Sequence, residues 1–162
     1  ARVERASARF WGTLTFGAHA NGYLADAQGR PTHLWVAQRA FDKATDPGAW
    51  DNLIGAGVPL GQSPRDAVLR EAWEEAGLSP AQAAAAVPQG VIELARDIPE
   101  GFQHEHLHTF DLRLPPGLQP VNQDGEVQRF ECVALNELRT QALWEAMTLD
   151  AALVTLDFLR RL

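Results

Sequence analysis

Three glutamates near the middle of the chain have the spacing of a shared metal site. Glu71, Glu74 and Glu75 lie three and four residues apart, so on a helix they share one face. Carboxylates crowded on one face repel each other. Mg²⁺ or Mn²⁺ relieves this repulsion, because both ions prefer oxygen ligands and can also bind a diphosphate. Arg70 stands one turn before Glu74 and can orient or neutralise it. The spacing indicates a diphosphate–metal site, with a solvated charged face as its alternative.

The surrounding residues carry signals for the helix that must present these acids. Ser63 is a typical N-cap, Pro64 suits the first helical position, and Asp66 stands three residues after the cap. The helix is predicted to run to about Ala76 and to stop at Gly77, a residue type that commonly ends helices.

Residues 55–78, GAGVPLGQSPRDAVLREAWEEAGL, resemble the Nudix box, G-x5-E-x7-R-E-U-x-E-E-x-G-U, where U is apolar. The second half, REAWEEAGL, fits the pattern. The opening glycine of the box falls on Ala56, inside a glycine-rich segment, 55–57, that we expect to be a loop. The early glutamate falls on Gln62, which removes one peripheral carboxylate. The resemblance implies a Nudix hydrolase of the α/β class, an α/β/α sandwich with a mixed β-sheet.

Further segments narrow the resemblance. GAHANGYL, LWVAQRAFDKATDPGAWDN and FDLRLPPGLQPVNQDGEV look like the Nudix domain that is fused to thiamine pyrophosphokinase in fungi. This resemblance covers roughly residues 14–140. It implies hydrolysis of thiamine diphosphate, or of its damaged oxo and oxy forms, to the monophosphate and phosphate. The matching residues are His19, Asn21, Gly22, Tyr23, Arg39, Lys43, Pro47, Gly48, Asp51, Asn52, Asp124, Gly125 and Glu126.

The resemblance also implies roles for the acids. Mg²⁺, or Mn²⁺ in its place, is expected to be held by Glu71, Glu74, Glu75 and the carbonyl of Gly55. A glutamate of the box, Glu71 or Glu74, or the later Glu126 would take the proton of the attacking water. Arg70 is expected to hold the box carboxylates by salt bridges. A solvated glutamate at the edge of a strand is the alternative for Glu126.

Substrate contacts are expected from several segments. Arg39 and Lys43 suit phosphate capture, with solvated loop charges as the alternative. Trp50, in a predicted short strand before the glycines, is expected to stack on a substrate ring, and Asn52 follows it. Glu105 matches a glutamate of the resembled domain, which implies a substrate or metal role, with a surface role as the alternative.

His104, His106 and His108 alternate along a predicted strand and therefore share one face. Alternate histidines can reach one zinc ion, but no second cluster with cysteine accompanies them. The alternative is a polar strand end that lines or flanks a pocket.

The remaining pattern predicts a hairpin followed by further strands and two terminal helices. The expected strands are Phe10–Leu24, Leu34–Gln38, Val87–Ala95, 104–114 and Val127–Leu135, with a loop at 115–124. Asn136 and Asp150 are expected to cap helices that reach about Met147 and Leu162. Residues 1–9 read as a loose lead-in.

Composition sets the outer bounds. The 162 residues are expected to form a single Nudix domain, and 46% of them are apolar. A net charge of −7 disfavours nucleic acid as a partner, since phosphate backbones need a basic surface. Cys132 is the only cysteine, which favours a reducing, cytoplasmic setting, and no apolar run is long enough to span a membrane. The oligomeric state is open, and a homodimer is one expectation.

Three other functions are compatible with this pattern. An isopentenyl diphosphate isomerase shares the fold and the diphosphate–metal logic, but it needs a cysteine in the pocket, and Cys132 in a late strand fits poorly. A nucleoside diphosphate-X hydrolase would use the same acids. A binding module without catalysis would explain Ala56 and Gln62, but the retained Arg70 and glutamates argue against it.

Overall fold

The computed structural model describes residues 7–139 and 141–162. Within them, seven strands form one mixed sheet in the order β3-β2-β1-β6-β5, with β4 beside β1 and β7 beside β2. The strands are β1 (Leu14–Ala25), β2 (Pro31–Arg39), β3 (Trp50–Asn52), β4 (Ile54–Gly57), β5 (Val87–Ile98), β6 (Gly101–Arg113) and β7 (Val127–Ala134). The helices are α1 (Ala8–Trp11), α2 (Pro64–Glu74), α3 (Pro80–Ala83), the 3₁₀ turn η2 (Glu137–Arg139), α4 (Gln141–Ala146) and α5 (Leu149–Arg160).

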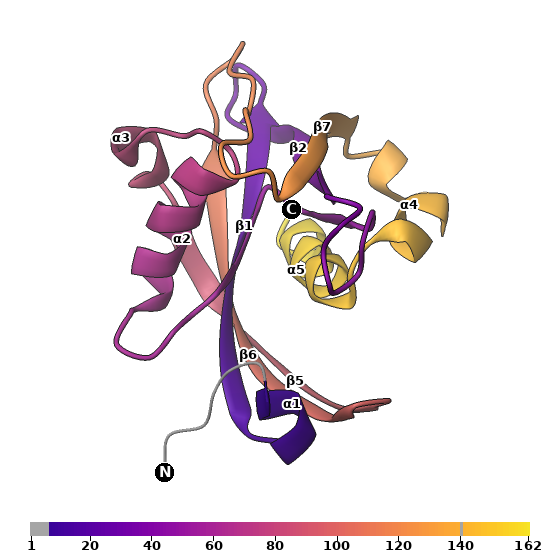
Figure 1. The fold of residues 1–162 in the computed structure, drawn as a ribbon. Coiled ribbons are helices and arrows are strands. Elements are labelled where there is room, and N and C mark those ends of the chain that lie inside the picture. Colours follow the sequence, from indigo (N-terminus) through magenta and orange to yellow (C-terminus); the bar gives the residue numbers. More distant parts are fainter. Residues whose placement is uncertain (1–6, 140) are drawn as a thin grey trace.

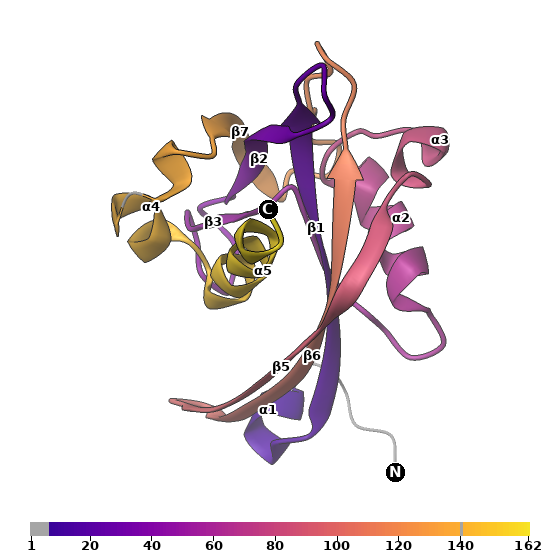
Figure 2. The same cartoon turned by 180° about the vertical axis from the view of Figure 1, so that it is seen from behind.

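Helices cover both faces of the sheet, which confirms the α/β/α sandwich. Helix α2 lies on one side of β1 and α5 on the other (Figures 1 and 2). The α2 face buries Val68 and Ala72 against the sheet, and the α5 face buries Phe158 with Val36. Because helices shield both faces of the sheet from water, the central strands can carry apolar side chains on both faces.

Strand β1 pairs with three other strands that carry residues of the site. Its residues 14–23 pair with β6 in parallel, and its other partners, β2 and β4, are antiparallel to it. Residues 17–20 of β1 pair with β4, and residues 22–25 pair with β2. The strand that leads into α2 therefore lies in the middle of the sheet, beside residues far away in the sequence.

Several predicted boundaries were wrong. Phe10 and Trp11 belong to α1, which ends at Gly12 in the left-handed conformation, so the first strand begins only at Leu14. The glycines at 55–57 form strand β4 and not a loop, because they pair with β1. Long-range strand pairing, which no local signal reveals, decides the second case.

The C-terminal helices also differ from the prediction. Thr148 caps α5 through its side chain, two residues before the expected cap at Asp150. The helix expected after Asn136 is divided into η2 and the short α4. Residue 140 within it, and residues 1–6 of the expected lead-in, lie outside the described residues. Among the described helices, none is both long enough and apolar enough to cross a membrane.

Candidate active site

Helix α2 begins as its sequence predicts. Ser63 caps it by accepting the N–H of Asp66 at 3.1 Å, and the Asp66 carboxylate accepts the N–H of Ser63 at 3.2 Å. Pro64 occupies the first turn. This reciprocal capping fixes where the helix starts and therefore which way its glutamates point.

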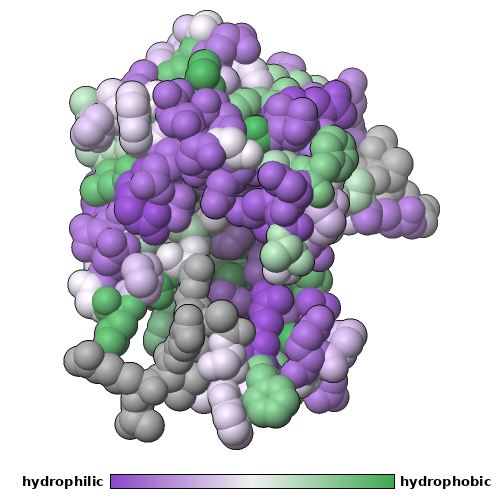
Figure 3. Space-filling model, viewed as in Figure 1, coloured by the Kyte–Doolittle hydropathy of each residue, from purple (hydrophilic) through white to green (hydrophobic). Residues whose placement is uncertain are grey.

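Two acidic side chains of α2 face a cavity of about 500 Å³ between the helix, the sheet and the start of α5. Glu71 and Glu74 line it, and Arg70 bridges them, 2.7 Å from an oxygen of each. Burial raises the pKa of Glu71, and the charges of Glu74 and Glu126 add to this. On the face of the molecule drawn in Figure 3, hydrophilic side chains surround a central hollow. The cavity thus concentrates negative charge that a cation would neutralise.

Glu75 turns away from its neighbours. Its carboxylate accepts the N–H of Gly55 at 2.9 Å, its side chain is buried, and it is not among the residues that line the acidic cavity. Burial raises the pKa of Glu75 well above its usual range, with the Gly55 hydrogen bond acting in the opposite direction. The glutamates therefore divide into two that face the cavity and one that fastens α2 to β4.

A third carboxylate joins the two that face the cavity. Oxygens of Glu71, Glu74 and Asp124 lie within 4.8 Å of one another. Asp124 lies on the loop after β6. A hydrogen bond from the Val121 N–H to the Ala76 carbonyl joins this loop to the end of α2. An oxygen-only donor set suits Mg²⁺ or Mn²⁺ and not a soft metal, so the residues present fit the expected ion.

Arg39 and Lys43 line the same cavity, but both already have acidic partners. Arg39 donates to Asp51 at 3.1 Å and to the Thr45 carbonyl, and Lys43 forms an ion pair with Glu126. A phosphate entering here would share or displace these pairs.

His19, Asp51 and Asp150 form a second group in the cavity wall that sequence reasoning missed as functional. Nδ1 of His19 lies 3.6 Å from Oδ1 of Asp51. Burial by itself would lower the pKa of His19, but the Asp51 and Asp150 carboxylates raise it to about 9. Although burial opposes it, the paired histidine holds the pKa of Asp51 below its usual range. The only available signal was that His19 and Asp51 stand in the resembled motifs.

Glu105 lies in the cavity wall, as a substrate contact would require, and accepts a hydrogen bond from Gln103 at 3.0 Å. Trp50 and Asn52 do not line this cavity. Both are buried, and the Trp50 ring packs against Arg129. Successive side chains of a strand point to opposite faces, so in β3 it is the intervening Asp51 that faces the cavity. The expected stacking role of Trp50 therefore has no support in its position.

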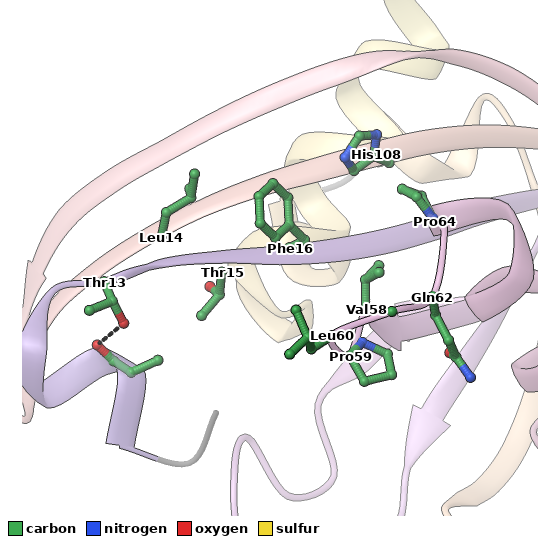
Figure 4. Close-up of a pocket in the computed structure, with 12 residues that line it drawn as sticks. Thr13, Leu14, Thr15, Phe16, Val58, Pro59, Leu60, Gln62, Pro64 and His108 are labelled. Atoms are coloured by element: carbon green, nitrogen blue, oxygen red, sulfur yellow. Dashed lines mark hydrogen bonds between the residues drawn. The ribbon is translucent and has the colours of Figure 1, made fainter. Parts of the chain in front are cut away.

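A second cavity of about 580 Å³ lies beside the first and is lined mainly by apolar groups (Figure 4). Phe16, Val58 and Leu60 form part of its wall, and His108 lies at its rim. Thr15 lines both cavities, so the two are neighbours across the start of β1.

The model of the NUDIX domain matches residues 15–153 of the chain. This chain belongs to the Nudix family. The expected Nudix assignment is thereby confirmed. Nudix hydrolases generally use a divalent cation such as Mg²⁺ to cleave diphosphate-containing substrates. The matched residues include every acid of the cavity, from β1 through the box to the start of α5.

Named relatives agree with this family. Nudix hydrolase 20, chloroplastic, of Arabidopsis thaliana is 34% identical over 98% of the chain and 42% of its own length. Nudix hydrolase 24, chloroplastic, of the same plant is 34% identical over 98% of the chain and 43% of its own length. An uncharacterized protein of Saccharomyces cerevisiae is 32% identical over 98% of the chain and 50% of its own length. The chain thus spans half or less of the length of these relatives.

Solved structures share the Nudix fold. DR0079 from Deinococcus radiodurans superposes with a TM-score of 0.66 at 23% identity, over 91% of this chain and 82% of that one. The NUDIX domain of Shewanella oneidensis NrtR, solved with ADP ribose, gives a TM-score of 0.66 at 13% identity, over 93% of this chain and 90% of that one. At such identities the likeness concerns the fold alone.

Proposed function

We propose that this Nudix domain hydrolyses thiamine diphosphate, or its oxo and oxy analogues, to the monophosphate and phosphate. The observation that carries the proposal is the cluster of Glu71, Glu74 and Asp124 facing Arg39 and Lys43 across one cavity. A diphosphate–metal site needs carboxylates that bind the metal ion and basic side chains that bind the phosphate groups.

Glu71, Glu74 and Asp124 would hold Mg²⁺ or Mn²⁺, and Gly55 and Glu75 stay expected contributors from the adjoining strand and helix end. When bound, the ion supplies charge neutralisation for the diphosphate and makes water more acidic. Arg70 keeps the two helix carboxylates in place through its paired contacts.

The chain's own groups account for the chemistry of the bond. A carboxylate, from the box or from Glu126, takes the proton of a water that attacks the terminal phosphorus. The bridging P–O bond breaks, and Arg39 and Lys43 stabilise the charge on the departing monophosphate. Both cations lie at the cavity wall near these acids, as this role requires.

The substrate class is supported by the convergence of the three resembled motifs. His19 from the first, Asp51 from the second and Glu126 from the third all line this cavity. Its ionisable lining is mainly acidic, and the extra carboxylates of Glu105 and Asp150 suit the cationic ring of thiamine better than a second anionic group. A nucleoside diphosphate-X substrate would offer these carboxylates ribose hydroxyls but no cationic ring.

An isopentenyl diphosphate isomerase is the second candidate, because the isomerase of Brevibacterium linens is 33% identical over 78% of the chain and 64% of its own length. Cys132 lies in β7 and does not line either cavity. Burial raises the pKa of its thiol, which keeps it protonated at neutral pH. Without a cysteine in the cavity, the hydrolase is the better supported reading.

The test is phosphate release from thiamine, nucleotide, sugar and isoprenoid diphosphates, each with Mg²⁺ and with Mn²⁺. The proposal expects release from thiamine diphosphate or an analogue to exceed release from the others by at least tenfold in kcat/KM. Preference for another diphosphate would overturn the thiamine assignment. Release from none, by protein that binds the metal, would favour a binding module.

The cytoplasmic location and the homodimer expected from the sequence stay predictions, and two plant relatives are named chloroplastic.

A further inference from the structure

Three ligand-bearing side chains stand together on the face of β6 opposite the acidic cavity. His104 and His106 are two residues apart on β6, and Glu93 of β5 pairs directly with His106. Ligand atoms of all three lie within 4.8 Å of one another. Nε2 of His104 is already 3.4 Å from Oε1 of Glu93. Alternate residues on one strand and a cross-strand neighbour share a face, so the backbone itself sets this arrangement.

We propose that Glu93, His104 and His106 form a second metal site, which takes Zn²⁺ or a similar transition-metal ion. Two imidazole nitrogens and one carboxylate are a donor set of zinc sites, with a fourth position left to water. At zinc–ligand distances of about 2.0 Å, ligand atoms in a tetrahedral site lie roughly 3.3 Å apart. The present spacing therefore needs only small adjustments of side chains that are partly exposed.

Neighbouring rings hold the two imidazoles near this geometry. The Phe16 ring packs edge-on against His106 with centroids 5.8 Å apart, and Phe102 packs against His104 at 6.5 Å. The two imidazoles are nearly perpendicular, with centroids 6.0 Å apart. Packing that limits ring rotation lowers the entropic cost of ordering these side chains when a metal ion binds.

The second site is separate from the acidic cavity in position and in chemistry. Glu105, between the two histidines, points to the other face and lines the cavity. The cavity offers Mg²⁺ an oxygen-only donor set, whereas imidazole nitrogens favour zinc and its neighbours in the transition series. Strand β6 thus lines the acidic cavity on one face and carries the two histidines of the second site on the other.

The experiment uses protein without a histidine tag, stripped with chelator and then saturated with Mg²⁺ to fill the acidic site. Co²⁺ is added and followed by its visible absorption, and Zn²⁺ is measured by competition with a chromophoric chelator. The proposal expects one equivalent to bind, and His104→Asn and His106→Asn each to weaken its affinity by tenfold or more. His33→Asn, a histidine on β2 outside the cluster, is the matched control and should bind as the wild type does.

Glu93→Gln keeps the proposal testable if a histidine variant fails to fold, because the Glu93 side chain is 66% exposed. It should also weaken zinc affinity. Absence of binding by the Mg²⁺-saturated wild type would overturn the proposal. Binding that persists in the histidine variants and disappears in Glu74→Gln would overturn it as well, by placing the ion in the acidic cavity.

Discussion

Nδ1 of His19 lies 3.0 Å from Oδ1 of Asn52, and this contact joins the wall of the cavity to a buried polar network. The Asn52 amide group donates to Asn21 and to Thr155, each at 3.0 Å. Asn52 is therefore a positioning residue, because it holds the imidazole that faces Asp51 while its own side chain is buried against α5.

Replacing Asn52 by leucine should lower the free energy of unfolding by roughly 2–4 kcal/mol, because it leaves several buried polar groups without partners. Urea unfolding measures this. Thr155→Val, which removes a single member of the network, should cost only about 1 kcal/mol. An Asn52→Leu protein as stable as the wild type would show that the network contributes nothing.

The raised pKa of His19, about 9, predicts how stability depends on pH in the metal-free protein. Between the unfolded value near 6.5 and about 9, the folded protein holds a proton that the unfolded chain has lost. The free energy of unfolding should therefore fall as pH rises through this window, by an amount on the order of 2 kcal/mol. Urea unfolding in chelator at pH 6.5, 7.5 and 9 checks the slope, and His19→Asn should flatten it. Parallel profiles for the two proteins would contradict the ion pair with Asp51.

Metal binding to the acidic cluster should be visible without any substrate. At a Mg²⁺ concentration ten times its Kd, the wild type should gain about 1.4 kcal/mol in stability. Glu71→Gln or Glu74→Gln should lose most of this gain and most turnover, while the metal-free fold persists. Thermal melts with and without Mg²⁺ measure the first effect and phosphate release the second. Glu131→Gln, an exposed glutamate on β7, is the control that should change neither.

Lys43 is the only lysine of the 162 residues, and its ion pair with Glu126 is partly exposed. Lys43→Ala should raise the KM for the diphosphate about tenfold, because a charge-assisted contact to phosphate is lost. Its melting temperature should hardly change, since such exposed pairs contribute about 0–1 kcal/mol. Lys43→Arg should recover most of the affinity. A diphosphate that fails to protect this lysine from acetylation in the wild type would place the phosphate elsewhere.

Gly77 controls how the loop that carries Asp124 meets α2. Its φ is +65°, and a Cβ there would lie 2.6 Å from the Val121 carbonyl oxygen. Gly77→Ala should therefore destabilise the fold by about 2–4 kcal/mol and weaken Mg²⁺ binding, because the loop must move. Urea unfolding and magnesium titration measure the two effects. Gly61→Ala, also at positive φ but with open space around it, should cost only about 1 kcal/mol and leave Mg²⁺ affinity unchanged.

Local signals in the sequence were enough for the box helix. The Ser63 cap, the proline after it and the spacing of Glu71 and Glu74 are short-range features, and each determines structure within one or two helical turns. The hairpin around residues 26–30 was equally local. The box pattern also sufficed to name the family, since its arginine and glutamates follow one another within two helical turns.

Only the tertiary structure decided which further groups complete the site. His19, Asp51, Asp124 and Asp150 come from four segments that strand pairing and loop packing bring to one cavity. It also decided that Glu75 and Trp50 are buried, and that Glu93 joins His104 and His106. The physical reason is that burial and cross-strand register are properties of the packed chain, and no short stretch of residues carries them.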